Sequence, residues 1–382
     1  MPDHMPDDLS ATGKDLRAYT DELRPRHGVV RDIHGEWVLL AHELVVQAAC
    51  SDDRFSNAVS RHLQVPNGLD SAEHTAYRAA LDRFLTPEAL APFLEEFRRV
   101  ARDLVSSLPR GVAVDAVSEV GIRYAVRAQS AWLGWPSSLE ARLVGWVAEN
   151  HAAARSGDRS WTRQVAESFD ELIRGLLEPR RGPGRAAEDV TARLMRTEVN
   201  GRMLTDAEIV SVLRNWTGGD LGSIAQCIGV LLHHLAMYPA AQDRLRTGVP
   251  EAEFDAIIDE ILRIDDPFVS SRRVTTCPVT IGAVELPQGA RVKLNWTSAN
   301  RDEAVFGDPN AMDPARNAGR NLVYGIGRHA CPGRLLATLE MRIALQALLA
   351  ATSSIALAPG QLAERAVSPV GGWARVPITL LG

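Results

Sequence analysis

The segment from residue 322 to residue 343 constrains this chain more than any other. It reads LVYGIGRHACPGRLLATLEMRI, and it places three glycines, one histidine and one cysteine within the nine positions 325–333 before apolar residues recur at helical spacing. Glycine permits positive φ and lets the backbone approach a flat ligand closely. Pro332 suits the first turn of a helix, so Cys331 is predicted to lie at a helix N-terminus, where unpaired amides and the helix dipole favour a thiolate.

A thiolate on such a loop is a suitable axial ligand for haem iron, whereas the alternative is a small buried cysteine in a glycine-rich turn. The segment YGIGRHACPG resembles the haem-binding loop of the cytochrome P450 family, with Tyr324 where the family usually has Phe and Cys331 in the place of the iron ligand. The resemblance extends from about residue 28 to the end of the chain. It implies haem b (iron protoporphyrin IX), a metal ligand at Cys331, and cofactor contacts at Tyr324, Gly325, His329 and Gly333, with His329 on a propionate.

The chain as a whole has the composition of a globular protein. Its 382 residues are 46% hydrophobic and 24% charged, and the formal net charge of -6 argues against nucleic acid or an anionic membrane as the main partner. No run of about 18 apolar residues occurs, and the acidic N-terminus lacks the features of a signal peptide. The four cysteines lie far apart without a CxxC pair, so neither a disulfide framework nor a zinc knuckle is indicated. We therefore expect a cytoplasmic protein with a disordered tail at 1–14 and one haem-thiolate domain at 15–382.

The pattern of apolar residues predicts a mainly α fold with a small β region. By the resemblance this is the cytochrome P450 fold, with haem between the long central helix and the helix that follows the cysteine loop. The helices at 140–154 and 161–177 are expected to form a mobile roof over a substrate entrance, and 179–187 reads as a basic, flexible linker. Further helices are predicted at 16–23, 42–50, 87–108, 114–133, 205–237, 251–264 and 335–349, and in SAEHTAYRAALDRF; strands are predicted at 29–33, 37–40, 274–276, 279–281, 291–294, 354–357 and 376–380.

Two further segments carry candidate propionate ligands. His74 and Arg78 are spaced i and i+4, so they share one helix face. Such a pair is commonly solvated surface, but HTAYR resembles the family's helix start whose His and Arg bind a haem propionate, and Arg suits a carboxylate through its planar fork of donors. Arg273 matches another propionate-binding Arg of the family, although the neighbouring Arg272 remains an alternative.

The long helix at 205–237 begins with a capping box formed by Thr205 and Glu208. Its length of about 50 Å would cross the molecule. Three glycines stand in its middle, at a cost of about 1 kcal/mol each relative to Ala, so a close approach or a bulge is expected there. In the family this place is the oxygen-binding groove, which makes Gly219 a predicted cofactor contact.

This groove departs from the family's usual signature of an acid followed by Thr, which together relay protons. Counting back from Pro239 puts the alcohol at Ser223 and the acid position at Gly222, whereas alignment on the acid gives Asp220 followed by Leu221. Neither register restores the pair. We favour Ser223 as the catalytic alcohol because the helix end is the firmer anchor, while Asp220 either relays protons through water or caps a bulge.

Glu260 and Arg263 stand three residues apart on a predicted helix. An exposed pair of this kind contributes only about 0.2–0.5 kcal/mol. In the family, ExxR is instead a buried structural pair joined by an Arg from a later segment, here around Arg316. The turn at 371–373 resembles the family's turn that reaches the substrate pocket, for which the other candidate segments are 59–68, the helix centre near 216 and 219, and 268–270.

The resemblance implies a haem-thiolate monooxygenase that inserts one oxygen atom from O2 into a small hydrophobic organic substrate. Electrons would come from a ferredoxin and a ferredoxin reductase that draws on NAD(P)H. The altered groove leaves open a peroxide-using or otherwise atypical haem-thiolate enzyme. A non-catalytic haem sensor and a helical scaffold without haem are the remaining alternatives.

Overall fold

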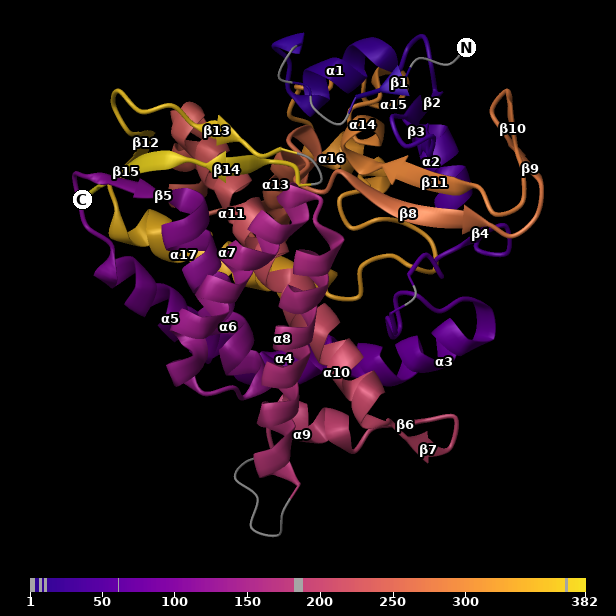
Figure 1. The fold of residues 1–382 in the computed structure, drawn as a ribbon. Helices are drawn as coiled ribbons and strands as arrows, with labels where there is room; N and C mark the ends of the chain where they lie inside the picture. The colour runs from indigo at the N-terminus through magenta and orange to yellow at the C-terminus, as the bar shows by residue number, and fades with distance from the viewer. Residues whose placement is uncertain (1–3, 7–8, 10–11, 61, 182–187, 368–369) are drawn as a thin grey trace.

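The fold is that of a mainly α protein with small β-sheets, as the sequence predicts (Figure 1). The computed structural model describes residues 4–6, 9, 12–60, 62–181, 188–367 and 370–382. The α-helices are α1 (Leu16–Leu23), α2 (His42–Ala49), α3 (Ser71–Leu81), α4 (Pro87–Leu90), α5 (Leu94–Ser107), α6 (Arg123–Leu133), α7 (Glu140–Ser156), α8 (Arg159–Leu177), α9 (Val190–Met195), α10 (Asp206–Arg214), α11 (Asp220–Met237), α12 (Pro239–Arg246), α13 (Glu251–Ile264), α14 (Trp296–Ala299), α15 (Glu303–Phe306), α16 (Pro314–Asn317) and α17 (Arg334–Ala351).

The largest sheet joins segments from the two halves of the chain. Its strand order is β1-β2-β3-β11-β8-β4. The predicted hairpin is confirmed, since β2 pairs antiparallel with β3. On its other side, β3 pairs in parallel with β11. The strands of this sheet are β1 (His4–Met5), β2 (Val29–Asp32), β3 (Trp37–Leu39), β4 (Phe55–Ser56), β8 (Ser270–Thr275) and β11 (Arg291–Asn295).

The remaining strands form small sheets at the edges of the helical body. The predicted strand β9 pairs with β10, which the sequence pattern did not predict. The C-terminal strands β12 and β15 pair as neighbours, and β5 completes their sheet. These strands are β5 (Ala113–Asp115), β6 (Glu198–Val199), β7 (Arg202–Met203), β9 (Val279–Ile281), β10 (Val284–Leu286), β12 (Ser354–Leu357), β13 (Glu364–Arg365), β14 (Trp373–Arg375) and β15 (Pro377–Leu381).

The predicted tail and linker are only partly described. Within residues 1–14, β1 pairs in parallel with β2, through His4 opposite Arg31 and Met5 opposite Asp32. Most of the predicted linker, residues 182–187, lies outside the described residues. The division into a tail and a single domain therefore stays a prediction.

The long central helix is present but is not regular throughout. Thr205 and Glu208 form the predicted capping box at its start. Asn215–Gly219 is a π-helical segment between α10 and α11, and Pro239 begins α12 after a bend of 104°. No single helix among the described residues is long and apolar enough to cross a membrane. Asp206–Met237 and α12, taken together as a bent pair, have sufficient length and apolar composition, and nothing beyond length and composition supports a span there.

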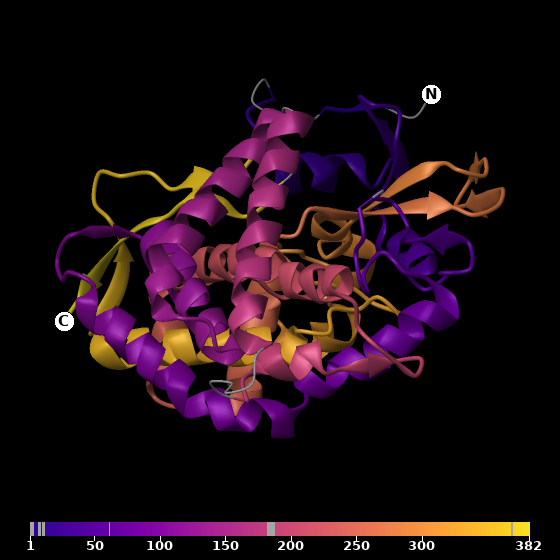
Figure 2. The same ribbon diagram turned by 60° about the horizontal axis from the view of Figure 1, so that its bottom comes forward.

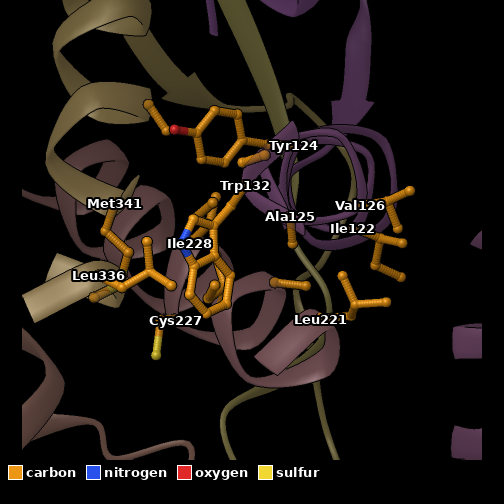
Figure 3. Packing of buried hydrophobic residues seen from close by; sticks show 14 of the residues in the cluster. Ile122, Tyr124, Ala125, Val126, Trp132, Leu221, Cys227, Ile228, Leu336 and Met341 are labelled. Atoms are coloured by element: carbon orange, nitrogen blue, oxygen red, sulfur yellow. The ribbon is translucent and has the colours of Figure 1, made fainter. Parts of the chain in front are cut away.

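The hydrophobic core surrounds α11. In Figure 3, Ile228 of α11 lies beside Trp132 of α6 and close to Leu336 and Met341 of α17, and all four side chains are buried. Side chains so closely packed restrict rotation of the helix about its axis, because interiors are as dense as organic crystals. The core therefore fixes which residues of α11 face the site described next.

Candidate active site

A cavity of about 550 Å³ lies between the central helix, α3, strand β8 and the loop that precedes α17. The candidate site residues around it come from four separate stretches of the chain, on α3, the central helix, β8 and the cysteine loop. Every candidate site residue named from the sequence lines it: His74, Arg78, Gly219, Asp220, Ser223, Arg273, Tyr324, Gly325, His329, Cys331 and Gly333. The structure thus places side chains that are up to about 260 residues apart in the chain around one space.

The cysteine loop closes on itself before it enters α17. The Cys331 N–H donates to the Tyr324 carbonyl at 2.8 Å, and Gly325 and Gly327 both adopt positive φ, of 67° and 77°. A Cβ on Gly327 would lie 2.8 Å from the backbone oxygen of Ala49, so this position has no room for a side chain. The loop is therefore a fixed frame that turns Cys331 into the cavity.

Helix α17 begins at Arg334 with Gly333 as its N-cap, so the prediction that Pro332 occupies the first turn is wrong by two residues. The amides of Gly333 and Arg334 hydrogen-bond to the Cys331 thiol and lower its pKa. Burial, reinforced by the nearby Asp220 carboxyl, outweighs them and raises the pKa of Cys331 to about 11. In the chain alone, burial and the amides of the loop thus act on the Cys331 thiol in opposite directions, and a coordinating metal would deprotonate the thiol outright.

Two histidines meet at one end of the cavity. The His74 side chain lies on α3 and is buried, and its ring centre is 4.1 Å from that of His329. Neither His74 Nδ1 nor His329 Nε2 has a hydrogen-bond partner, although the Asp70 carboxylate is 3.9 Å from the latter. Burial, with the neighbouring His74 and Arg273, lowers the pKa of His329 to about 4. Buried polar atoms are normally hydrogen-bonded, so these two nitrogens are available to bind a polar group of a ligand in the cavity.

Two arginines complete this basic end. Arg273 is 5% exposed, and burial lowers the pKa of its guanidinium to about 10 although Asp70 opposes the shift. Its Nη1 donates to Ser271 Oγ and to the Arg272 carbonyl, and no described carboxylate lies within 4 Å of it. Arg272 follows the alternation of β8 and is exposed, which favours Arg273 as the inward residue. Arg78 Nη1 donates to the carbonyl of Ala330 at 3.0 Å and so ties α3 to the cysteine loop.

Each glycine in the middle of the central helix is required by a different neighbour or space. A Cβ on Gly218 would lie 3.0 Å from the ring of Trp146, and a Cβ on Gly222 would lie 2.8 Å from Nε2 of His151, so α7 approaches α11 closely at both glycines. Figure 1 and Figure 2 show α7 and α8 lying across α11. Gly219 meets nothing within 4 Å and opens to the cavity. The two alternatives expected from the sequence, a bulge and a close approach, both occur.

Both candidate proton-relay residues face the cavity from α11. The Ser223 hydroxyl donates to the Gly219 carbonyl at 2.6 Å, one turn earlier. Burial raises the pKa of Asp220 to about 7, so this carboxyl exchanges its proton near neutral pH. Among the described residues, no hydrogen bond joins the side chains of Ser223 and Asp220, so each faces the cavity independently of the other.

The family is decided by comparison with known proteins. The cytochrome P450 family model matches residues 156–353. The nocardicin C N-oxygenase of Nocardia uniformis subsp. tsuyamanensis is 30% identical over 395 residues, which cover 95% of this chain and 94% of that protein. The chain belongs to the cytochrome P450 family. The cyclomarin C epoxidase CymV of Salinispora arenicola (strain CNS-205) is 29% identical over 355 residues, 88% of each protein.

The fold of this cytochrome P450 is also that of solved relatives. A cytochrome P450 from Chondromyces apiculatus superimposes with a TM-score of 0.86 at 24% identity, over 99% of this chain and 98% of that one. Members of the family use haem, so the protein is a haem-dependent oxidoreductase, and relatives named as epoxidase, hydroxylase and monooxygenase support monooxygenase activity.

The residues of the cavity fit haem. A haem needs a thiolate for its iron and cationic or N–H donors for its two propionates. Two cysteines line the cavity: Cys331, on the loop that precedes α17, and Cys227, which is 3% exposed on α11. The cavity also has a basic group in which His74 and His329 have unpartnered nitrogens and Arg273 has no carboxylate within 4 Å among the described residues. A buried guanidinium without a counter-ion is costly, and a carboxylate ligand removes that cost. The donor set is that of a carboxylate-bearing iron macrocycle.

The ExxR pair of the cytochrome P450 is buried, as the resemblance implied. Arg263 donates to both carboxylate oxygens of Glu260, at 2.9 and 2.8 Å, and its side chain is fully buried. The predicted third member is wrong: Asn317 Nδ2, not Arg316, donates to Glu260, because Asn317 points inward from α16. The other groups that accept from the guanidinium are the carbonyls of Asn300, Pro309 and Ala311.

The sequence predicted only part of the rest of the cavity wall. Residues from 59–68, 216, 219, 268 and 270 line it, as expected. The turn at 371–373 is not among the lining residues; Gly371 and Gly372 instead pack closely on Pro267. Four side-chain amides also line the cavity: Gln64 and Asn67 lie within the expected segment 59–68, whereas Asn57 and Asn215 were not predicted, because no periodic pattern marks them.

Proposed function

We propose that this cytochrome P450 inserts one oxygen atom from O2 into a small, mainly apolar organic substrate bound in the cavity. Electrons come singly from a ferredoxin, supplied by a ferredoxin reductase that draws on NAD(P)H. The observation that carries the proposal is the presence, in one cavity under α11, of the Cys331 thiol and a separate basic end. A reducing cytoplasm suits a chain whose four cysteines are all free.

Each part of the cavity has a role in holding the cofactor. Cys331 ligates the iron, and the frame of Tyr324, Gly325 and Gly333 sets its direction; the Tyr324 hydroxyl is itself held at 3.0 Å from Thr338 Oγ1. Gly219 leaves room for the flat face of the cofactor, since no atom would meet a Cβ there within 4 Å. The propionates are bound by the basic end, that is by His74, Arg78, Arg273 and His329. When bound, thiolate-ligated haem supplies the oxygen chemistry, because electron density from the thiolate favours O–O cleavage.

The protein groups above the cofactor manage protons and water. The Ser223 hydroxyl, anchored on the Gly219 carbonyl, keeps acceptor lone pairs free for a proton donor. Asp220 holds a proton with a pKa of about 7, raised by burial, and this suits a group that gains and loses protons at neutral pH. Both are proposed as catalytic residues.

The wall of the cavity favours a mainly apolar substrate. Large apolar side chains line it at Leu85, Trp216, Ile224 and Phe268, and the amides named above give it a few polar positions. Sites of this kind bind small molecules through apolar contact and use few polar groups for orientation. Relatives are named for substrates as different as linalool, erythromycin and methyl-branched lipids, so the substrate is best sought by a broad screen for shifts of the haem spin state.

The test of this proposal has two parts. Reduced protein with carbon monoxide should show the red-shifted Soret band of thiolate ligation, and Cys331→Ala should abolish it; retention of the band would refute the ligand. Product should then form with a ferredoxin system. Because Gly222 lacks an acid, use of hydrogen peroxide is the second candidate, and a peroxide-driven rate above the ferredoxin-driven rate would favour it. Spin-shifting ligands that give no product with either would favour a haem sensor.

A further inference from the structure

A histidine from another helix occupies the space of the missing acid side chain. His151 lies on α7, and its Nε2 would be 2.8 Å from a Cβ built on Gly222 of α11. A Cβ at this distance would force the imidazole to move, so the observed position of the His151 ring depends on glycine at position 222. Gly222 is the acid position in the register that places the alcohol at Ser223. The imidazole is therefore where an Asp carboxylate on α11 would otherwise project.

The contact is built into the crossing of the two helices. One turn away from Gly222 along the central helix, Gly218 receives the ring of Trp146, which is itself stacked on Phe169 of α8 with ring centres 4.0 Å apart. Trp146 and His151 thus both point from α7 onto glycines of the central helix. A single accidental contact would not need two glycines at this spacing, each of which weakens the helix by about 1 kcal/mol.

The surroundings of His151 suit proton transfer. Burial, with a smaller contribution from Arg155 one turn further along α7, lowers the pKa of His151. A neutral imidazole at neutral pH has one nitrogen that donates and one that accepts, so it can take a proton on one side and release one on the other. On α8, Thr162 faces α7 with a neutral hydroxyl that donates to the Ala153 carbonyl, and Asp220 lines the cavity from the first turn of α11.

We propose that His151, from α7, supplies the acid–base group that Gly222 of α11 lacks and passes protons to Ser223. This rests on the proposed monooxygenase function. His151 first takes up a proton from solvent at Nδ1 and becomes a transient imidazolium. It then releases its Nε2 proton to a bridging water, the water gives one proton to Ser223 Oγ, and Ser223 releases its own hydroxyl proton into the cavity. His151 is left neutral with its proton on Nδ1, and exchange with solvent restores the Nε2-protonated tautomer, so no net charge remains on the relay. No electron moves in these steps.

The first experiment does not depend on turnover. The carbon monoxide complex of the reduced holoenzyme is diamagnetic, so 15N-histidine NMR can follow the titration of His151, assigned with His151→Gln. Ser223→Ala should shift the titration midpoint of His151 or change its tautomer, whereas Ser168→Ala on α8, whose hydroxyl donates to the Val165 carbonyl, should not. An unchanged His151 titration in Ser223→Ala would overturn the proposal, even if the enzyme is an active monooxygenase.

The second experiment moves the acid back onto α11. His151→Ala should lower the product formed per electron pair by roughly 100-fold, the lower end of what general acid–base catalysis contributes. His151→Ala with Gly222→Asp should restore most of it, because removal of the imidazole makes room for the carboxylate; Gly222→Asp alone should not. Arg142→Gln, an exposed change on the same helix, is the control. Equal coupling in His151→Ala and Arg142→Gln, or no rescue by the double variant, would contradict the relay.

Discussion

Replacement of Arg263 by Leu tests how the cytochrome P450 is held together behind its cysteine loop. The guanidinium is fully buried and donates to five oxygens at 2.8–3.2 Å: both carboxylate oxygens of Glu260 and three backbone carbonyls. All three carbonyls belong to the segment between β11 and α16. Leu fills much of the volume but leaves every acceptor without its donor.

The cost follows from burial. Removal of one partner from a buried ion pair costs about 3–5 kcal/mol, and each carbonyl left unsatisfied adds about 1–3 kcal/mol unless water enters. Glu260 keeps donors from Asn317 Nδ2 and the Asp313 amide, which limits the loss, so we take about 5 kcal/mol. With about 2.1 cal/mol/K of unfolding entropy per residue, 382 residues have about 0.8 kcal/mol/K, and the melting temperature should fall by about 6 °C.

The matched control has the same spacing and geometry on the surface. Glu96 and Arg99 are also three apart and form two hydrogen bonds, at 2.6 and 2.9 Å, but the Arg99 side chain is 54% exposed. Arg99→Leu should therefore cost less than about 1 kcal/mol. Urea unfolding followed by circular dichroism measures both free energies. Equal losses in the two variants would refute the argument that burial, rather than pairing itself, makes the ExxR pair important.

Three further variants test the cavity and its supports. Arg273→Leu should weaken haem affinity by about 10–100-fold, as expected for lost hydrogen bonds to a charged group, while the exposed Arg272→Leu should not; haem transfer to apomyoglobin measures both. Gly327→Ala should lower unfolding free energy by about 1–3 kcal/mol, because φ is 77° and a Cβ would meet the carbonyl at the end of α2. Arg202 holds the pKa of Glu208 well below its usual 4.5. The ionised Glu208 therefore stabilises the folded state fully above about pH 4.5, and this stabilisation is lost as the pH falls through the lower pKa of the folded state. Glu208→Gln should accordingly flatten the fall of the unfolding free energy at acid pH.

Local patterns predicted the elements whose boundaries are set by nearby residues. The helices α1 and α13 have the predicted bounds, and the capping box of Thr205 and Glu208 forms as predicted, because each depends on residues within one turn. The predicted helix at 87–108 is interrupted at Ala91–Phe93, where Pro92 lies within a 3-10 turn. Proline cannot donate the hydrogen bond that a continuous helix needs.

Features that depend on distant partners could not be predicted in this way. His151 is about 70 residues from Gly222 in the chain, and nothing near either residue marks their contact. Desolvation within the fold and the Asp220 carboxyl raise the pKa of Cys331, whereas its sequence neighbours alone argue for a lowered value. The choice of Asn317 rather than Arg316 as the partner of Glu260 depends on how α16 packs on α13.

The register of the central helix explains why the count from Pro239 leads to a residue that lines the cavity. Counting back from Pro239 crosses only α11, which is regular from Asp220 to Met237, so each residue adds the same rotation about the axis. The irregular π-helical segment, Asn215–Gly219, lies before this stretch and does not affect the count. Ser223 donates to the Gly219 carbonyl one turn back, and both Ser223 and Asp220 line the cavity. Because they stand three residues apart on a regular helix, they share one face of α11, so the two registers considered from the sequence lead to the same cavity.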